Sequence, residues 1–226
     1  HTGAVSFAAL STPEAVARFF AESFPDACRL IPTLRQDFFA HPTGHMVTVK
    51  CAPWHAGDHT LLLGDAAHAI VPFFGQGMNC GFEDCSLLMD GHDAGATLRD
   101  LVPRFGALRK PHTDAIADMA VENFVEMRDK VGNAAFLMGK EVEKRLQHAF
   151  PGQFLSRYSM VTFSRMPYRV AFDAGVIADG IVRELCAECR HADSVDLTRA
   201  RRLIEARLAP FMAAHSDALN LWSRRA

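Results

Sequence analysis

The chain has 226 residues, of which 49% are hydrophobic and 22% charged, and its formal net charge at pH 7 is −2. This composition is that of an ordinary globular protein, and it excludes collagen-like, low-complexity and disulfide-scaffold classes. The charge excludes the basic field that nucleic-acid binding requires, so we expect no nucleic-acid partner. Apolar runs stay below the roughly 18 residues that a membrane-spanning helix needs, so no transmembrane segment is predicted.

The chain starts with His1 rather than Met, and residues 2–7 have the pattern of a strand inside a domain. We interpret this as an internal start, in a fragment, a partial gene or a processed chain. The sequence shows no signal-peptide pattern of basic, apolar and small residues, and we therefore expect a cytoplasmic protein.

Cysteines are spread along the chain, at positions 28, 51, 80, 85, 186 and 189. Disulfide scaffolds are typical of small secreted proteins, so free thiols are the better interpretation here. Cys186 and Cys189 have the C-x-x-C spacing of metal ligands, with His191 close behind. A zinc site needs a second pair of ligands at suitable spacing, and we predict no metal site.

The first quarter of the chain carries signals for both helices and strands. Residues 11–14, Ser-Thr-Pro-Glu, predict a capped helix start with a helix to about residue 22. A short helical turn is expected over 26–31. Alternation of apolar residues over 46–51 predicts a strand, and the continuous apolar run 60–63 predicts a buried parallel strand.

From Gly77 onward the pattern is mostly helical. The longest predicted helix is expected to bend at Gly132 or Gly139, since glycine weakens a helix interior. A stretch with Pro and Gly, residues 103–111, is the candidate junction between two subdomains. Helices are predicted over residues 82–90, 112–148, 172–190 and 196–209.

The segment 61–85, LLLGDAAHAIVPFFGQGMNCGFEDC, carries the pattern of a binding site. Asp65 follows a strand, at the sheet edge where ligands bind in open α/β folds. Gly75 and Gly77 precede a helix, so the backbone can approach a ligand and helix N–H groups can face an anionic or carbonyl-rich group. Asp65 can accept hydrogen bonds from a sugar or ribityl chain. A tight strand-to-helix connection without a ligand is the alternative.

One helical stripe holds a polar residue among apolar ones. Asn123 interrupts it, and a buried Asn needs hydrogen-bond partners. A substrate ammonium or carboxylate is one candidate, and a backbone group or water is the other. Tyr158 has a similar alternative, as a core tyrosine with its hydroxyl at the surface. The stripe consists of Ile116, Met119, Ala120, Asn123, Met127 and Val131.

The string G-D-A-A-H, followed by P-x-x-G-Q-G-x-N and Glu-Asp, resembles the second FAD motif of the flavin-dependent aromatic hydroxylases. Within that family, residues 71–84, 122–128 and 158–165 look most like the branch whose substrate is kynurenine. The resemblance covers the chain from about residue 45 to residue 175.

The resemblance implies a mixed α/β fold, the C-terminal part of a Rossmann-like FAD-dependent hydroxylase. Residues 1–58 are expected to form part of a substrate-side sheet, and residues 59–110 the C-terminal part of the FAD-binding domain. Residues 111–226 are expected to form a helical C-terminal domain.

The resemblance also implies roles for single residues. Asp65 would contact the ribityl or pyrophosphate part of FAD, and Met78 and Asn79 would meet the flavin. Asn123 and Tyr158 would hold the amino-acid part of kynurenine. We assign no protein nucleophile or general base, because the flavin carries the chemistry. The cofactor-binding residues are thus Asp65, Pro72, Gly75, Gly77, Met78 and Asn79, and the substrate-binding residues are Phe73, Phe74, Asn123, Glu126, Met127 and Tyr158.

The implied activity is that of an FAD-dependent monooxygenase of tryptophan degradation, which hydroxylates L-kynurenine to 3-hydroxykynurenine with NADPH and O2. The family's N-terminal G-x-G-x-x-G turn is not in this sequence, so we expect the chain alone to be inactive. The sequence leaves open whether the protein forms a homodimer. The alternatives are another FAD-dependent aromatic hydroxylase, or a non-catalytic fragment or interaction module without the N-terminal FAD half.

Overall fold

The computed structural model describes residue 3 and residues 5–216 of the chain, which divides into two units after Met46. Residues 5–7 form bends and a turn, so the strand predicted there is wrong for its described part. The reason is local, because the Ser6 hydroxyl donates to the Gly3 carbonyl at 3.0 Å and closes a turn. Residues 2 and 4 of that prediction lie outside the described part.

The first unit holds three helices, α1 (Pro13–Ser23), α2 (Pro25–Leu30) and α3 (Leu34–Ala40). Thr12 caps α1, since its Oγ1 accepts a hydrogen bond from the Ala15 N–H at 3.2 Å. The predicted helix start and the predicted turn over 26–31 are therefore confirmed. Aromatic rings, with centroids 5.4–6.4 Å apart, hold the three helices together: Phe7, Phe19, Phe20, Phe24, Phe38 and Phe39.

The second unit begins with a two-stranded antiparallel sheet, β1 (His55–Ala56) and β2 (Thr60–Leu61). Gly57, with φ of +64°, lets the chain turn back at once, so the nearest partner for the apolar run is β1. The prediction of a buried parallel strand over 60–63 is therefore wrong. Only one side of the run is covered, because Leu61 and Leu63 pack near Trp54 while Leu62 is exposed.

The strand predicted over 46–51 is also wrong, although the chain is extended there. The Val49 N–H donates to the Ala69 carbonyl at 2.9 Å, and the Cys51 N–H donates to the Ala67 carbonyl at 3.2 Å. Ala67 lies in the short helix α4 (Asp65–His68), so these two hydrogen bonds do not pair residues 46–51 with another strand. The part of the chain that the structure describes is thus mostly helical, with one small sheet.

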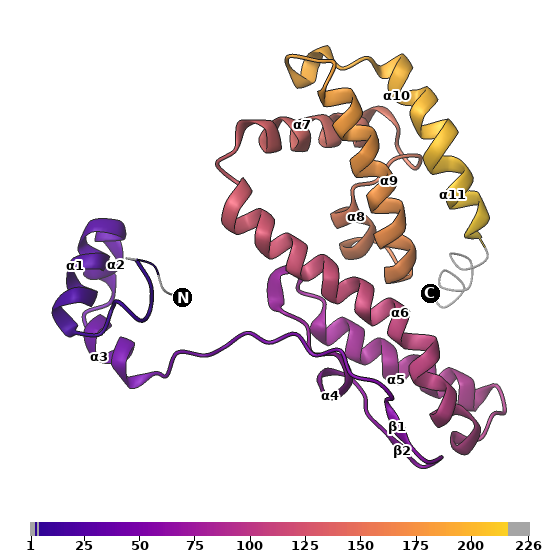
Figure 1. Ribbon diagram of the computed structural model, residues 1–226, viewed down its shortest axis with the longest axis horizontal. Helices are drawn as coiled ribbons and strands as arrows, with labels where there is room; N and C mark the ends of the chain where they lie inside the picture. The colour runs from indigo at the N-terminus through magenta and orange to yellow at the C-terminus, as the bar shows by residue number, and fades with distance from the viewer. Residues whose placement is uncertain (1–2, 4, 217–226) are drawn as a thin grey trace. The chain divides into compact units, whose positions relative to one another are not determined.

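Helices build the rest of the second unit (Figure 1). The predicted helix over 82–90 is confirmed within α5, whereas the one over 112–148 is two helices. A π-helical turn at Glu126–Lys130 and Gly132 separate them, close to one of the two expected bends. The elements are a 3-10 turn at Pro72–Phe74, α5 (Gly77–Asp93), α6 (Leu98–Val125) and α7 (Ala134–Ala149).

Residues 103–111 lie inside α6, so this stretch with Pro and Gly is helix and not a loop. Gly106 serves close packing instead: a Cβ on it would lie 3.2 Å from the Trp54 Cβ. Trp54 is buried together with Phe105 and Ala67, and this small core attaches the sheet to α6. The wider division at residues 58 and 110 stays a prediction.

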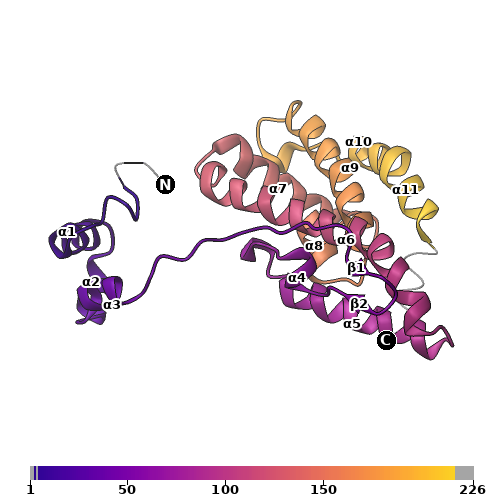
Figure 2. The ribbon, with the colours of Figure 1, turned by 60° about the horizontal axis from the view of Figure 1, so that its bottom comes forward.

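The last helices form a bundle in which α9 contacts α6, α7, α8 and α10 (Figure 2). The helices predicted over 172–190 and 196–209 are confirmed, and their ends lie within about one turn of the predicted ones. Among the described residues, no helix has both the length and the apolar character to span a membrane. The elements are α8 (Arg157–Thr162), α9 (Tyr168–Cys186), a 3-10 turn at Ala192–Ser194, α10 (Leu197–Leu203), a π-helical turn at Ile204–Leu208 and α11 (Ala209–Ala214).

A buried ionic cluster ties α4, α5 and α6 together. The Asp84 carboxylate accepts from the Arg109 Nε at 2.8 Å and the Gly64 N–H at 3.1 Å, and lies 2.5 Å from the His68 Nε2. A second Arg109 nitrogen donates to Glu83 at 3.0 Å. Burial raises the pKa of Asp84, but hydrogen bonds from His68 and Arg109 outweigh it and hold that pKa below its ordinary value.

We predict that Asp84→Asn destabilises the chain by about 3 kcal/mol, because it leaves the buried Arg109 charge without its partner. The control is Asp118→Asn, since Asp118 is 53% exposed and pairs with Lys50 at the surface. That change should cost below about 1 kcal/mol. Urea unfolding of both variants measures the difference, and equal costs would contradict the assignment of Asp84 as a structural anion.

The lowered pKa of Asp84 also predicts a pH dependence. A carboxylate whose pKa falls on folding stabilises the folded state above its unfolded pKa of about 3.9, and this contribution is lost as the pH drops through the folded pKa. The gap in unfolding free energy between the parent chain and Asp84→Asn should be constant near neutral pH and shrink below about pH 4. Urea titrations from pH 7 downward test this, and a gap that widens in acid would refute it.

Candidate functional site

The start of α4 packs closely on the second turn of α5. Gly64 has a φ of +58°, which favours glycine, and a Cβ on Gly81 would lie in van der Waals contact with the Gly64 Cα, at 3.6 Å. The Gly64 N–H is fixed by Asp84. Asp65, the next residue, is exposed as the first residue of α4. The buried ionic cluster therefore sets where this carboxylate stands beside α5.

The N-terminus of α5 is open and lined with backbone. Gly75 has a φ of +66°, and neither it nor Gly77 has an atom within 4 Å of the place a Cβ would take. No side chain caps the first turn of α5, and Met78 and Asn79 are exposed there. Such a helix start can face an anionic or carbonyl-rich ligand with its free N–H groups.

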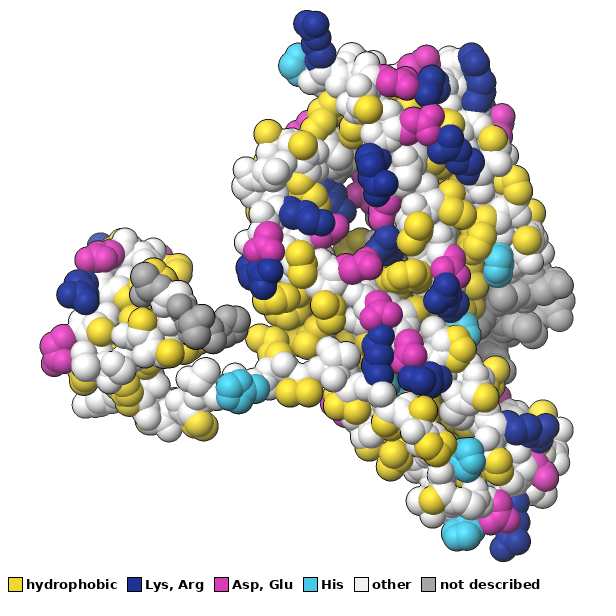
Figure 3. All heavy atoms as spheres, viewed as in Figure 1, with side chains coloured by type: hydrophobic (Ala, Val, Ile, Leu, Met, Phe, Trp, Pro, Cys, Tyr) yellow, Lys and Arg dark blue, Asp and Glu magenta, His cyan; other side chains and the backbone are white. Residues whose placement is uncertain are grey.

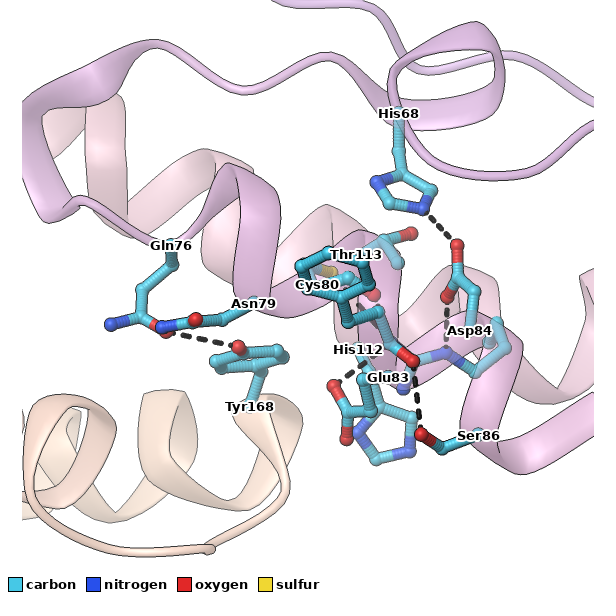
Figure 4. A network of polar contacts seen from close by, with 12 residues as sticks. His68, Gln76, Asn79, Cys80, Glu83, Asp84, Ser86, His112, Thr113 and Tyr168 are labelled. Carbon is cyan, nitrogen blue, oxygen red and sulfur yellow. Dashed lines mark hydrogen bonds and ion pairs between the residues drawn. The ribbon is translucent and has the colours of Figure 1, made fainter. Parts of the chain in front are cut away.

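The buried side chain of Gln76 links this loop to its neighbours. This residue was not singled out from the sequence. Its Oε1 accepts hydrogen bonds from the Asn79 Nδ2 and from the Tyr168 hydroxyl, each at 3.1 Å. In Figure 4 the three side chains point toward one another, with Tyr168 reaching across from α9. The sequence signals for Gln76 are its place between two glycines and its place in the motif P-x-x-G-Q-G-x-N.

Three groups of the polar network in Figure 4 are uncharged at pH 7. Burial raises the pKa of the Cys80 thiol to about 12, and it raises the pKa of the Tyr168 hydroxyl. Burial, followed by the Arg109 charge, lowers the pKa of His112 to about 4. These three groups are therefore poor nucleophiles or bases at neutral pH.

Two phenylalanines join the loop to the helical bundle. The Phe73 carbonyl accepts a hydrogen bond from the Asn123 Nδ2 at 2.6 Å, and the Phe73 ring lies 4.6 Å from that of Phe124. The ring of Phe74 lies 5.7 Å from that of Tyr158. A backbone carbonyl is thus one hydrogen-bond partner of Asn123, in agreement with the alternative that a backbone group, and not a substrate group, satisfies this side chain.

Four of the expected substrate residues line one cavity, of about 480 Å³. They are Asn123, Glu126, Met127 and Tyr158. The view of Figure 3 shows charged side chains around a hollow in the helical bundle. The α7 wall adds a row of polar side chains that sequence reasoning missed, although their spacing places them on one helix face: Lys140, Glu143, Lys144 and Gln147.

The cavity carries both signs of charge. Lys140 Nζ lies 3.2 Å from Glu143 and 3.8 Å from Glu126. Burial raises the pKa of Glu143, and the Lys140 charge opposes that rise. Groups of both signs beside an amide and a phenol can recognise a zwitterion with an aromatic part.

The stripe that pointed to Asn123 is core only in its first half. Ile116, Met119 and Ala120 are buried, but Met127 and Val131 are 56% and 55% exposed. The helix changes to a π-helical turn at Glu126–Lys130, which rotates the later residues away from the core. Tyr158 is 50% exposed, so it is a cavity-wall residue rather than a core tyrosine.

Comparison with known proteins gives a family-model match and several relatives. Residues 22–91 match the FAD binding domain model. Kynurenine 3-monooxygenase of Myxococcus xanthus is 60% identical over 95% of this chain and 46% of its own length. The enzymes of that name from Dictyostelium discoideum and Xanthomonas euvesicatoria are each 41% identical, over 90% and 95% of this chain and 47% of their own length.

The chain thus spans about half the length of the curated relatives it matches. The resemblance to the kynurenine branch of the flavin-dependent aromatic hydroxylases is confirmed, because the chain is homologous, over that half, to proteins named kynurenine 3-monooxygenase.

Proposed function

We propose that this chain is part of an FAD-dependent monooxygenase that hydroxylates L-kynurenine to 3-hydroxykynurenine with NADPH and O2. The observation that carries the proposal is the meeting of Asn123, Glu126, Met127 and Tyr158 around one cavity. The names of the relatives support the same activity. The C-terminal part of a Rossmann-like FAD domain, a cytoplasmic location and a homodimer stay predictions.

The residues around the start of α5 fit one side of an FAD molecule. Gly75 and Gly77 leave open space over the backbone, and Asp65 is an exposed acceptor for ribityl or ribose hydroxyls. Met78 and Asn79 would meet the flavin at the exposed helix start, beside Pro72. Bound FAD would supply the activation of O2, which the side chains of this chain cannot provide.

The residues of the cavity fit the task of holding and orienting an amino acid with an aromatic ring. The Asn123 amide and the Tyr158 hydroxyl can bind its carboxylate or ammonium, and Glu126 adds a negative charge. Phe73 and Phe74 connect this cavity to the loop before α5. Their apolar rings would exclude water from the reacting ring, which limits uncoupled loss of reducing equivalents.

The activity is testable in a chimera in which this chain replaces the matching 46% of the Myxococcus xanthus relative. We expect a yellow protein that consumes NADPH in the presence of kynurenine and releases 3-hydroxykynurenine, identified by mass spectrometry. A flavin-loaded chimera that hydroxylates other aromatic substrates but leaves kynurenine unchanged would overturn the substrate assignment.

We predict that Asp65→Ala in this chimera weakens FAD binding by about 10- to 100-fold, the loss expected for hydrogen bonds to a charged group. Asp65 is exposed, so the free energy of unfolding of the flavin-free protein should stay constant. The matched control is Asp93→Ala, at the other end of α5. Flavin fluorescence titration gives both dissociation constants, and equal values would remove Asp65 from the site.

We predict that Tyr158→Phe raises the kynurenine dissociation constant about tenfold, through loss of one hydrogen bond, while FAD stays bound. The control is Ser194→Ala, which removes a hydroxyl that donates to the His191 carbonyl outside the cavity and away from the loop. Its kynurenine affinity should equal that of the parent chimera. Calorimetric titration measures both variants, and unchanged affinity in Tyr158→Phe would exclude a role of the hydroxyl.

A further inference from the structure

Arg157 is the first residue of α8, and its guanidinium joins three helices. One nitrogen forms a salt bridge with Glu122 of α6, and the other donates to Asp179 of α9 at 2.6 Å. The side chain is 17% exposed, so solvent screens these pairs less than it screens surface pairs. The two salt bridges therefore restrain the start of α8 against both helices.

Each of these contacts is next to a substrate residue of the proposed function. Glu122 immediately precedes Asn123, and Arg157 immediately precedes Tyr158. Ser156, Tyr158 and Asn123 line the cavity, whereas the Arg157 side chain does not. Arg157 therefore stands behind the cavity wall and can influence a ligand only through its neighbours.

The place of Arg157 depends on a glycine in α9. A Cβ on Gly175 would lie 2.5 Å from the Arg157 Nε, 2.7 Å from its Cγ and 2.9 Å from its Cβ. The guanidinium also lies 5.5 Å from the centre of the Phe172 ring. The side chain thus lies directly on the backbone of α9, and any side chain at position 175 must displace it.

A second anchor holds the same end of α8 to a different helix. The Gln147 Oε1 of α7 accepts from the Ser156 N–H at 2.6 Å and from the Ser159 hydroxyl at 3.3 Å. This anchor fixes α8 on α7, but it does not reach α6, which carries Asn123. Loss of Arg157 would therefore leave α8 attached while its distance from α6 becomes less restrained.

We propose that Arg157 is a positioning residue that sets the spacing between Asn123 and Tyr158 across the cavity. The part of this proposal that concerns affinity for an amino-acid substrate rests on the proposed function. The part that concerns geometry does not, and it can be tested on this chain without ligand.

The geometric test uses the fluorine NMR signals of the chain labelled with 3-fluorotyrosine, since it has two tyrosines. Gly175→Ala should displace Arg157 and move or broaden the Tyr158 signal, while the buried Tyr168 signal stays in place. The matched control is Gly180→Ala in the same helix, where a Cβ meets no atom within 4 Å. An unchanged Tyr158 signal in Gly175→Ala would overturn the proposal.

Glu122→Gln keeps the test decisive if Gly175→Ala fails to fold. Glu122 is about half exposed, so its substitution spares the core while removing the salt bridge from Arg157 to α6. The Tyr158 signal should move again, with the thermal midpoint close to that of the parent. If the signal stays in place in this folded variant, Arg157 does not set the spacing.

The functional test uses the chimera with the Myxococcus xanthus relative. Arg157→Met should raise KM for kynurenine at least about tenfold, since misplaced substrate groups bind poorly, with a smaller change in kcat and unchanged FAD affinity. Arg157→Lys, which keeps the charge but not the fork of two nitrogens, should recover part of the loss. Equal KM values in Arg157→Met and the parent would overturn the functional part. Absence of kynurenine turnover in the parent chimera would instead refute the proposed function. The geometric part of the proposal would then still be decided by the NMR result alone.

Discussion

The second unit depends on one desolvated carboxylate, that of Asp84. It lies near donors from three segments, the Arg109 guanidinium, the His68 ring and the Gly64 backbone, and no water need reach it. A buried charge is tolerated only where its partners are in place, so the three segments cannot shift independently. This constraint holds the residues before α5 against α5 and α6. The exposed Asp65 and the open glycine loop are consequences of that arrangement, because they follow directly from the segment that Asp84 fixes.

Helix α6 transmits the position of this cluster to the cavity. Arg109 lies in its first half and Asn123 near its C-terminal end, about 21 Å away at 1.5 Å per residue. The helix continues through Pro111, so the side chain that pairs with Asp84 and the one that bonds the Phe73 carbonyl are carried by the same helix. Gly106, packed on Trp54, secures the same helix to the small sheet.

The sequence predicted the helices well where their signals are local. Thr12 and Pro13 mark a helix start because capping and the fixed φ of proline act within one turn. It failed for the strand over 46–51 and for the parallel pairing of the run 60–63, because alternation and apolar runs do not say which partner is available. The resemblance named four residues that share a cavity, but not the face of α7 with Lys140 and Glu143. Arg157 was beyond sequence reasoning too, since its role depends on Gly175 and Asp179 in another helix.

The loop of residues 72–77 connects the two parts of the site, and it is held from both sides. On one side the Phe73 carbonyl is bonded to Asn123 of α6, and on the other Gln76 is bonded to Tyr168 of α9. The Phe74 ring packs beside Tyr158 of α8.

A group bound at the start of α5 and a group bound in the cavity would therefore contact the same short loop from opposite ends. Because α6 and α9 also pack on each other, the loop cannot follow one of them without straining its bond to the other. The two parts of the site are consequently fixed by one set of helix contacts, and the geometry of the cavity is a property of the whole bundle rather than of its lining residues.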